Sequence, residues 1–183
     1  MSMIEAMANA KHVSLSGYLS NVKDGLILEF GVAGGSTING IADAVPNRKV
    51  YGFDSFEGLP EDWRPGISAG TFKQDRLPEV KSNVELVVGL FSDTLPKFLE
   101  EHREPIAFIH IDCDLYSSTK CVFDLVKDRC QDGTIIAFDE IRSYTGFEDH
   151  EYKAFNEFLE QTGYKWECIG QHGGEQAGFV IYK

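Results

Sequence analysis

The chain has 183 residues, of which 43% are hydrophobic and 25% charged, and this composition is typical of one soluble globular domain spanning residues 1–183. An excess of 29 acidic over 17 basic residues gives a net charge of −12. Because so acidic a surface repels phosphate backbones and anionic lipid, the charge argues against a nucleic-acid or membrane-surface partner. We interpret most of the charge as a solvated surface that leaves some carboxylates to bind cations.

The start of the chain and its cysteines indicate a cytoplasmic protein. The opening segment MSMIEAMANA has neither the basic nor the apolar region of a signal peptide, and no apolar run approaches the ~20 residues of a spanning helix. Cys113, Cys121, Cys130 and Cys168 show no CxxC spacing and lie within apolar segments. We therefore expect buried, reduced thiols rather than a zinc site.

Short apolar runs alternate with segments of helical periodicity. In chain order we expect strands and helices at 26–32 (strand), 36–44 (helix), 49–53 (strand), 84–88 (strand), 93–102 (helix), 106–112 (strand), 116–129 (helix), 134–138 (strand) and 151–161 (helix). Pro96 fits the second of these helices, 93–102, only within its first turn, and Gly163 ends the last helix. The irregular stretch 57–78 is long enough to suggest a functional loop.

The chain ends with two further strand-like runs at 164–169 and 177–182. No helix fits into residues 170–176 between them, so we expect an antiparallel hairpin. Together the elements predict an α/β fold with one doubly wound, mostly parallel, seven-stranded sheet that ends in this C-terminal hairpin. This arrangement is unlike a plain dinucleotide-binding fold and resembles that of the Rossmann-like class I methyltransferases.

A glycine-rich loop, Glu29 to Thr37 (EFGVAGGST), lies between the first strand and the first following helix. Glycines let the backbone approach a ligand, and the helix N-terminus offers free N–H donors. The next strand ends at Asp54, about 20 residues further on, where a carboxylate can accept hydrogen bonds from ribose hydroxyls. The glycine loop and Asp54 together predict a nucleoside cofactor, although a glycine loop alone can also be a tight turn with a helix cap.

Glu29 favours one cofactor over another. A carboxylate just before the glycines would repel the pyrophosphate of NAD but attract an ammonium group. S-adenosylmethionine carries an ammonium and a sulfonium and no phosphate, so this loop favours S-adenosylmethionine. The alternative is that Glu29 is paired with another protein group.

Acidic residues follow two later strands, at Asp112 and at Asp139–Glu140. Neighbouring strands lie ~5 Å apart, so these carboxylates can converge on one point. Oxygen ligands without Cys or His suit Mg²⁺, Mn²⁺ or Ca²⁺. The competing interpretations are that Glu140 is solvated and that Asp114 caps the following helix, and for Asp114 we favour the cap.

Other candidates carry weaker signals. We expect His110 to be a hydrogen-bonded core residue and assign no role to His150 or His172. Residues 89–93 can form an apolar wall for an adenine base or a simple turn and helix cap. No GxSxG, HExxH or Walker-type motif occurs, so serine hydrolase, zincin and P-loop functions lack their minimum parts.

Five segments resemble, in order, the macrocin O-methyltransferase family: LEFGVAGGST, YGFDSFEGLP, GLFSDTLP, FIHIDCDLYSST and AFDE. The resemblance spans residues 26–140 and implies a class I S-adenosylmethionine-dependent enzyme that methylates hydroxyl groups of small molecules. By this resemblance, Asp112, Asp139 and Glu140 bind a divalent metal, and Asp112 is the catalytic base. The expected cofactor-binding residues are Glu29, Gly31, Val32, Gly34, Ser36, Thr37, Asp54, Ser55, Phe56, Gly89, Phe91 and Asp112.

The sequence departs from the family in two places. The family usually carries Asp-Asp where this chain has Asp139-Glu140, and the longer side chain can shift the metal. Only about 25 residues precede the first strand, so we expect an open acceptor site and do not transfer the family's sugar specificity.

The sequence thus predicts an Mg²⁺-dependent O-methyltransferase for a sugar or another vicinal diol, with a small-molecule acceptor as partner and a homo-oligomer left open. The alternatives are a metal-independent N- or O-methyltransferase of the same fold, an NAD(P)-dependent oxidoreductase, and a non-enzymatic cofactor-binding scaffold. We expect 57–78 and 141–149 to exclude water from the site.

Overall fold

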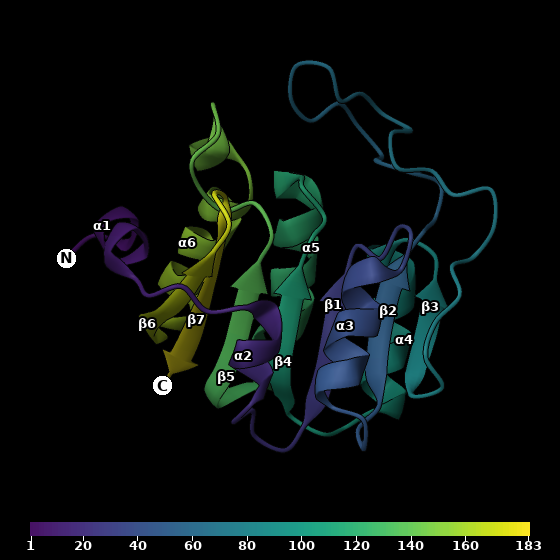
Figure 1. Ribbon diagram of the computed structural model, residues 1–183, viewed down its shortest axis with the longest axis horizontal. Coiled ribbons are helices and arrows are strands. Elements are labelled where there is room, and N and C mark those ends of the chain that lie inside the picture. The colour runs from purple at the N-terminus through teal and green to yellow at the C-terminus, as the bar shows by residue number, and fades with distance from the viewer.

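A computed structural model describes residues 1–183 and contains one sheet of seven strands in the order β3-β2-β1-β4-β5-β7-β6 (Figure 1). The strands are β1 (Leu26–Phe30), β2 (Val50–Asp54), β3 (Val84–Val88), β4 (Ile106–Ile111), β5 (Cys130–Phe138), β6 (Lys165–His172) and β7 (Gln176–Tyr182). β1 to β5 pair in parallel, and β7 runs antiparallel to both β5 and β6. The predicted mostly parallel sheet with a terminal hairpin is confirmed.

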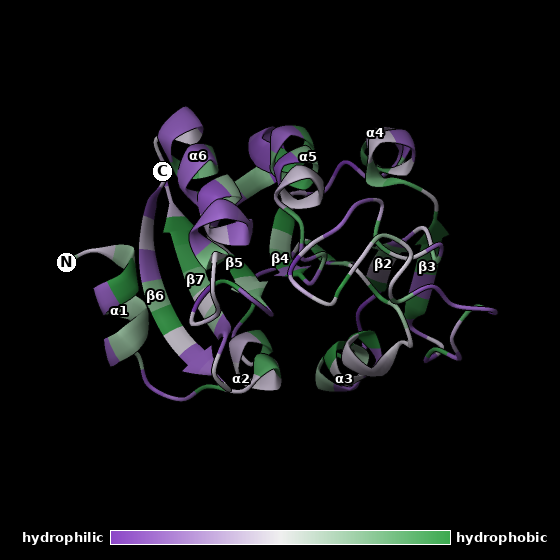
Figure 2. Cartoon of the chain, turned by 90° about the horizontal axis from the view of Figure 1, so that it is seen from above, coloured by the Kyte–Doolittle hydropathy of each residue, from purple (hydrophilic) through white to green (hydrophobic).

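Helices cover both faces of the sheet, as Figure 2 shows. The helices are α1 (Met3–Asn9), α2 (Leu15–Leu19), α3 (Ser36–Ala44), α4 (Phe91–Glu101), α5 (Tyr116–Val126) and α6 (Glu151–Thr162), with short 3₁₀ turns at Lys127–Arg129 and Phe147–Asp149. α4, α5 and α6 lie on one face, α2 and α3 lie on the other, and α1 packs beside β6. No helix is long and apolar enough to cross a membrane.

The two faces of the sheet have separate apolar cores. The larger core, of 27 buried residues, lies on the side of α4, α5 and α6 and includes Phe30, Phe123 and Phe155. The smaller core, of 14, lies under α2 and α3. All side chains of β1 and β4 are buried, as expected for central strands covered on both sides. This rigid centre holds the loops at the carboxyl edge of the sheet.

Several element boundaries differ from the prediction. α4 begins at Phe91 rather than at residue 93, so Pro96 lies beyond the first turn and removes the hydrogen bond to the Ser92 carbonyl. β5 begins at Cys130 rather than at 134, and β6 extends to His172, which shortens the hairpin turn. The irregular segment between β2 and β3 extends away from the sheet above its carboxyl edge (Figure 1).

Candidate active site

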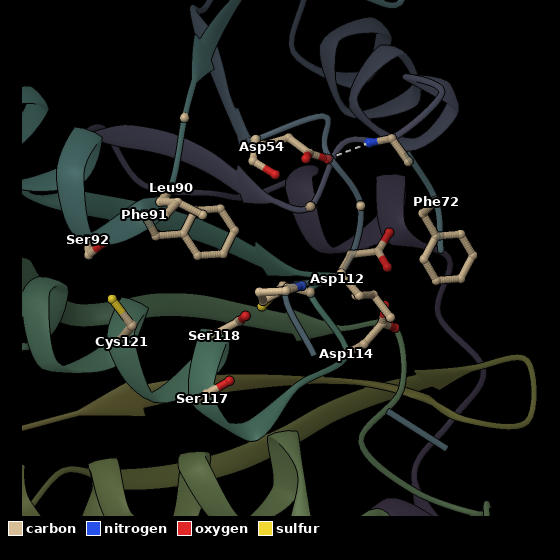
Figure 3. Close-up of a pocket in the computed structure, with 18 of the residues that line it drawn as sticks. Asp54, Phe72, Leu90, Phe91, Ser92, Asp112, Asp114, Ser117, Ser118 and Cys121 are labelled. Atoms are coloured by element: carbon tan, nitrogen blue, oxygen red, sulfur yellow. Dashed lines mark hydrogen bonds between the residues drawn. The ribbon is translucent and has the colours of Figure 1, made fainter. Parts of the chain in front are cut away.

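A cavity of about 460 Å³ opens at the carboxyl edge of the sheet, above β1, β2, β4 and β5 (Figure 3). Its lining residues follow these strands and β3 or lie in the first two turns of α4 and α5: Gly31, Ala33, Asp54, Ser55, Gly58, Leu59, Pro60, Phe72, Gly89, Leu90, Phe91, Ser92, Asp112, Cys113, Asp114, Ser117, Ser118, Cys121, Asp139 and Glu140. The carboxyl edge is where open α/β sheets bind ligands.

The glycine loop is held in a conformation that requires glycine at its first position. Gly31 has a φ of +91°, and a Cβ atom there would lie 1.7 Å from the Asp112 carbonyl oxygen. Gly35, with a φ of +81°, immediately precedes α3. The backbone at Gly31 therefore packs directly against the strand end that carries Asp112.

Asp54 organises the glycine loop through its carboxylate. Its Oδ2 accepts hydrogen bonds from the backbone N–H groups of Val32 and Ala33, both at 2.8 Å, and its Oδ1 accepts one from Phe56 N–H at 2.7 Å. A carboxylate oxygen can accept two hydrogen bonds. Because Asp54 lines the cavity, Oδ1 retains one position for a donor from a bound molecule.

The two ends of the cavity differ in chemistry. Leu90, Phe91 and Cys121 lie at one end and give it an apolar wall, with Ser92 beside them (Figure 3). Asp112, Asp114 and Phe72 lie at the other end. The predicted apolar wall after the third strand therefore lines the same cavity as the acidic residues.

Three carboxylates converge at the acidic end. Atoms of Asp112, Asp114 and Glu140 all lie within 4.8 Å of one another. Burial, followed by the charges of neighbouring carboxylates such as Asp139, raises the pKa of Glu140 to about 11. Burial also raises the pKa of Asp112 to about 8 and that of Asp114 to about 6. Burial and like charge therefore both oppose full ionisation of these three carboxyl groups.

The structure bears on two of the competing interpretations. Glu140 is only partly exposed, and its Oε2 is buried without a hydrogen-bond partner. Asp114 does not cap α5, which begins after Leu115 without any side-chain cap. The φ of Asp114 is +64°, a left-handed conformation that turns the chain between β4 and α5. An unpartnered buried oxygen among hard oxygen donors fits a divalent cation.

Asp139 does not belong to this group of three. Its Oδ1 accepts a hydrogen bond of 2.6 Å from Gln176 Nε2, at the start of β7, although the residue still lines the cavity. Of the expected metal ligands, Asp112 and Glu140 lie in the group of three together with Asp114, and Asp139 lines the same cavity outside that group. The hydrogen bond that holds Asp139 comes from β7, a distant part of the chain, so sequence patterns do not reveal it.

Glu29 is enclosed within the sheet. Its side chain is fully buried, and its Oε1 lies 3.0 Å from Nδ1 of His110 on the neighbouring strand β4. Burial raises the pKa of Glu29, whereas the contact with His110 lowers it. Burial lowers the pKa of His110, but Glu29 raises it, and the net change is a rise. Glu29 does not line the cavity, and His110 is the hydrogen-bonded core residue that was expected.

The structure brings only part of the predicted cofactor set to the cavity. Gly31, Asp54, Ser55, Gly89, Phe91 and Asp112 line it, whereas Glu29, Val32, Gly34, Ser36, Thr37 and Phe56 do not. Ser117, Ser118 and Cys121 were missed, although their helical spacing just after the acidic segment could have indicated one face of α5. Leu59, Pro60 and Phe72 were also missed, because sequence periodicity does not place residues within a long loop.

The two loops expected to exclude water contact each other. The Arg64 guanidinium lies 4.0 Å from the centre of the Trp63 ring and 4.8 Å from that of Tyr144. Arg64 also forms an ion pair of 3.3 Å with Glu175 in the β6–β7 turn. The loop after β2 is thus fastened to the loop after β5 and to the hairpin.

Comparisons with known proteins agree with the fold and the cavity. Residues 28–141 match a sequence family described as a methyltransferase domain. No curated protein matches the sequence.

Several solved structures share the fold. The calicheamicin methyltransferase CalS11 is 24% identical and aligns over 86% of this chain and 72% of its own, with a TM-score of 0.69. An apo structure of the same protein describes it as a TDP-rhamnose 3'-O-methyltransferase. The O-methyltransferase NovP is 22% identical over 89% of this chain and 74% of its own, with a TM-score of 0.62. MycE from the mycinamycin biosynthetic pathway, solved with Mg and SAH, is 12% identical over 88% of this chain and 45% of its own, with a TM-score of 0.55.

Proposed function

The chain belongs to the methyltransferase domain family, and from this membership we propose that it is an S-adenosylmethionine-dependent O-methyltransferase that acts on a hydroxyl group of a small molecule. The proposal includes Mg²⁺ or another divalent cation at the acceptor. One observation carries it: a single cavity joins the glycine loop and Asp54 to three convergent carboxylates.

The cofactor would extend along the cavity. The apolar wall at Leu90 and Phe91 would contact adenine, and the free position on Asp54 Oδ1 would accept a ribose hydroxyl. The methionine portion would lie beside Gly31, which lines the cavity next to Asp112. The sulfonium methyl group would then face the acidic end of the cavity.

Asp112, Asp114 and Glu140 are the residues that would hold the cation. Their oxygens are hard ligands, and the buried Oε2 of Glu140 lacks any partner within the protein. A divalent cation bound here would lower the pKa of an acceptor hydroxyl and offset the charge of the carboxylates. Without the cation, Glu140 would hold a proton at neutral pH, because burial and neighbouring carboxylates raise its pKa to about 11.

Asp112 would act as the base. As the acceptor oxygen forms its bond to the methyl carbon, the bond from that carbon to sulfur breaks and S-adenosylhomocysteine is released. The hydroxyl proton passes to the Asp112 carboxylate. The fastened loops at Trp63 and Tyr144 would hold water away from this reaction.

The acceptor that we propose is a sugar or another vicinal diol. CalS11 is described as a TDP-rhamnose 3'-O-methyltransferase, and MycE was solved with Mg and SAH. The first description supports an oxygen acceptor for this chain, and the second supports a metal. A metal-independent N- or O-methyltransferase of the same fold is the alternative, whereas the family match speaks against the NAD(P)-dependent oxidoreductase.

Calorimetry tests the proposal. We expect S-adenosylmethionine to bind at one site and NAD⁺ not to bind. Mg²⁺ or Mn²⁺ should bind to the wild-type protein and to the control variant Glu148→Ala, which alters an exposed acid outside the cavity, but much more weakly to Glu140→Ala. Methyl transfer that survives both EDTA and Glu140→Ala would contradict the metal role and favour the metal-independent alternative.

A further inference from the structure

Glu151, the first residue of α6, is a fully buried acid with no role in the chemistry above. It does not line the cavity and is not one of the three convergent carboxylates. Burying a carboxyl group costs free energy unless the group is paired or hydrogen-bonded. Its position at a helix N-terminus stabilises an acid but does not explain why one is buried there.

The contact that Glu151 makes is with the backbone of a proposed cation ligand. Its Oε1 accepts a hydrogen bond of 3.2 Å from the backbone N–H of Asp114. Asp114 is itself buried, so its N–H needs an acceptor inside the protein. Glu151 supplies this acceptor from an element 37 residues further along the chain.

The backbone of Asp114 needs such support. Its φ of +64° is a left-handed conformation, which residues other than glycine adopt uncommonly and which the surrounding contacts help to hold. This conformation separates the side chain of Asp114 from the α5 terminus and brings it beside Asp112 and Glu140. A relaxed turn would move the carboxylate away from that group.

We propose that Glu151 is a positioning residue that holds Asp114 in its left-handed turn and thereby completes the cation site. This proposal rests on the proposed function, because the position of Asp114 affects the reaction only if a cation binds there. Its structural part, the hydrogen bond to the Asp114 N–H, stands independently of the cation. A residue of α6 thus helps to position the proposed metal ligands, which themselves follow strands of the sheet.

Three variants test this role: Glu151→Gln keeps a carbonyl oxygen as acceptor, Glu151→Leu removes it, and Glu160→Leu alters an exposed residue of the same helix as a control. Hydrogen exchange at the Asp114 amide and calorimetric Mn²⁺ binding are the readouts. Glu151→Leu should speed the exchange at least about tenfold and weaken Mn²⁺ binding about 10- to 100-fold, as loss of a ligand-orienting contact does. Glu151→Gln and Glu160→Leu should leave both close to the wild-type values, and all variants should keep their affinity for S-adenosylmethionine.

Equal exchange and Mn²⁺ affinity in Glu151→Leu and wild type would overturn the proposal, as would losses in Glu151→Gln as large as those in Glu151→Leu. If Glu151→Leu does not fold, hydrogen exchange at the Asp114 amide of the wild-type protein is the test. Protection of this amide supports the hydrogen bond to Glu151, whereas exchange at the rate of an exposed turn overturns it. Slow exchange at Asp114 without any Mn²⁺ binding to the wild type would contradict the proposed metal role but not the hydrogen bond.

Discussion

Single residues at the carboxyl edge of the sheet have exact steric and electrostatic requirements. Gly31 has no room for a side chain, Asp54 uses both carboxylate oxygens on backbone N–H groups, and Glu29 is paired with His110 inside the sheet. Each of these residues shapes the cavity through its backbone or through a neighbour. Substitutions at this scale should therefore separate effects on stability from effects on ligand binding.

Gly31→Ala should damage both stability and cofactor binding. Its Cβ would meet the Asp112 carbonyl and would require a positive φ, so we expect the free energy of unfolding to fall by at least about 1–3 kcal/mol. Gly40→Ala is the matched control, because Gly40 lies inside α3 with open space around it and should gain about 0.5–1 kcal/mol. Urea unfolding and calorimetry with S-adenosylmethionine measure the two effects. A Gly31→Ala variant with wild-type stability would contradict the packing described above.

Glu29 offers a test of whether its charge reaches the cofactor. Glu29→Ala leaves His110 buried without its partner and should cost about 3–5 kcal/mol of stability. Glu29→Gln keeps a carbonyl oxygen near His110 and should retain wild-type affinity for S-adenosylmethionine, because residue 29 does not line the cavity. A tenfold loss of affinity in a stable Glu29→Gln variant would restore the direct contact predicted from the sequence.

At the scale of elements, the loop after β2 is held in place by contacts rather than by secondary structure. Trp63, Arg64 and Tyr144 join it to the loop after β5, and Arg64 also reaches Glu175 of the hairpin turn. These contacts involve segments that are far apart in the sequence. They fasten the loop that also supplies Gly58, Leu59 and Phe72 to the cavity lining.

Arg64→Ala should release this loop while leaving the sheet intact. Cation–π contacts contribute about 0.5–2 kcal/mol, so we expect a small change in global stability but faster hydrogen exchange across residues 57–72. Lys73→Met is the control, because its ion pair with Glu57 is exposed and such pairs contribute little. Unchanged exchange in Arg64→Ala would show that the loop is held by other contacts.

Across the whole molecule, the sequence was sufficient for the sheet but only partly sufficient for the site. Continuous apolar runs and short connections predicted the strands and the hairpin, because both depend on local patterns. The convergence of Asp112 and Glu140 followed from adjacent parallel strands. The position of Asp114 beside these two, with Asp139 hydrogen-bonded elsewhere, did not, because it depends on a left-handed backbone at Asp114 and on Gln176 from β7. The enclosure of Glu29 likewise depends on its register opposite His110.

A crystal structure with S-adenosylhomocysteine and Mn²⁺, with the anomalous signal of manganese recorded, tests whether one cavity binds both the cofactor and a divalent cation. We expect the nucleoside in the cavity with its ribose at Asp54 and one manganese peak among Asp112, Asp114 and Glu140. A cofactor bound elsewhere would contradict the proposed site. Manganese held by Asp139 in place of Asp114, or no manganese in the cavity, would contradict the proposed ligand set.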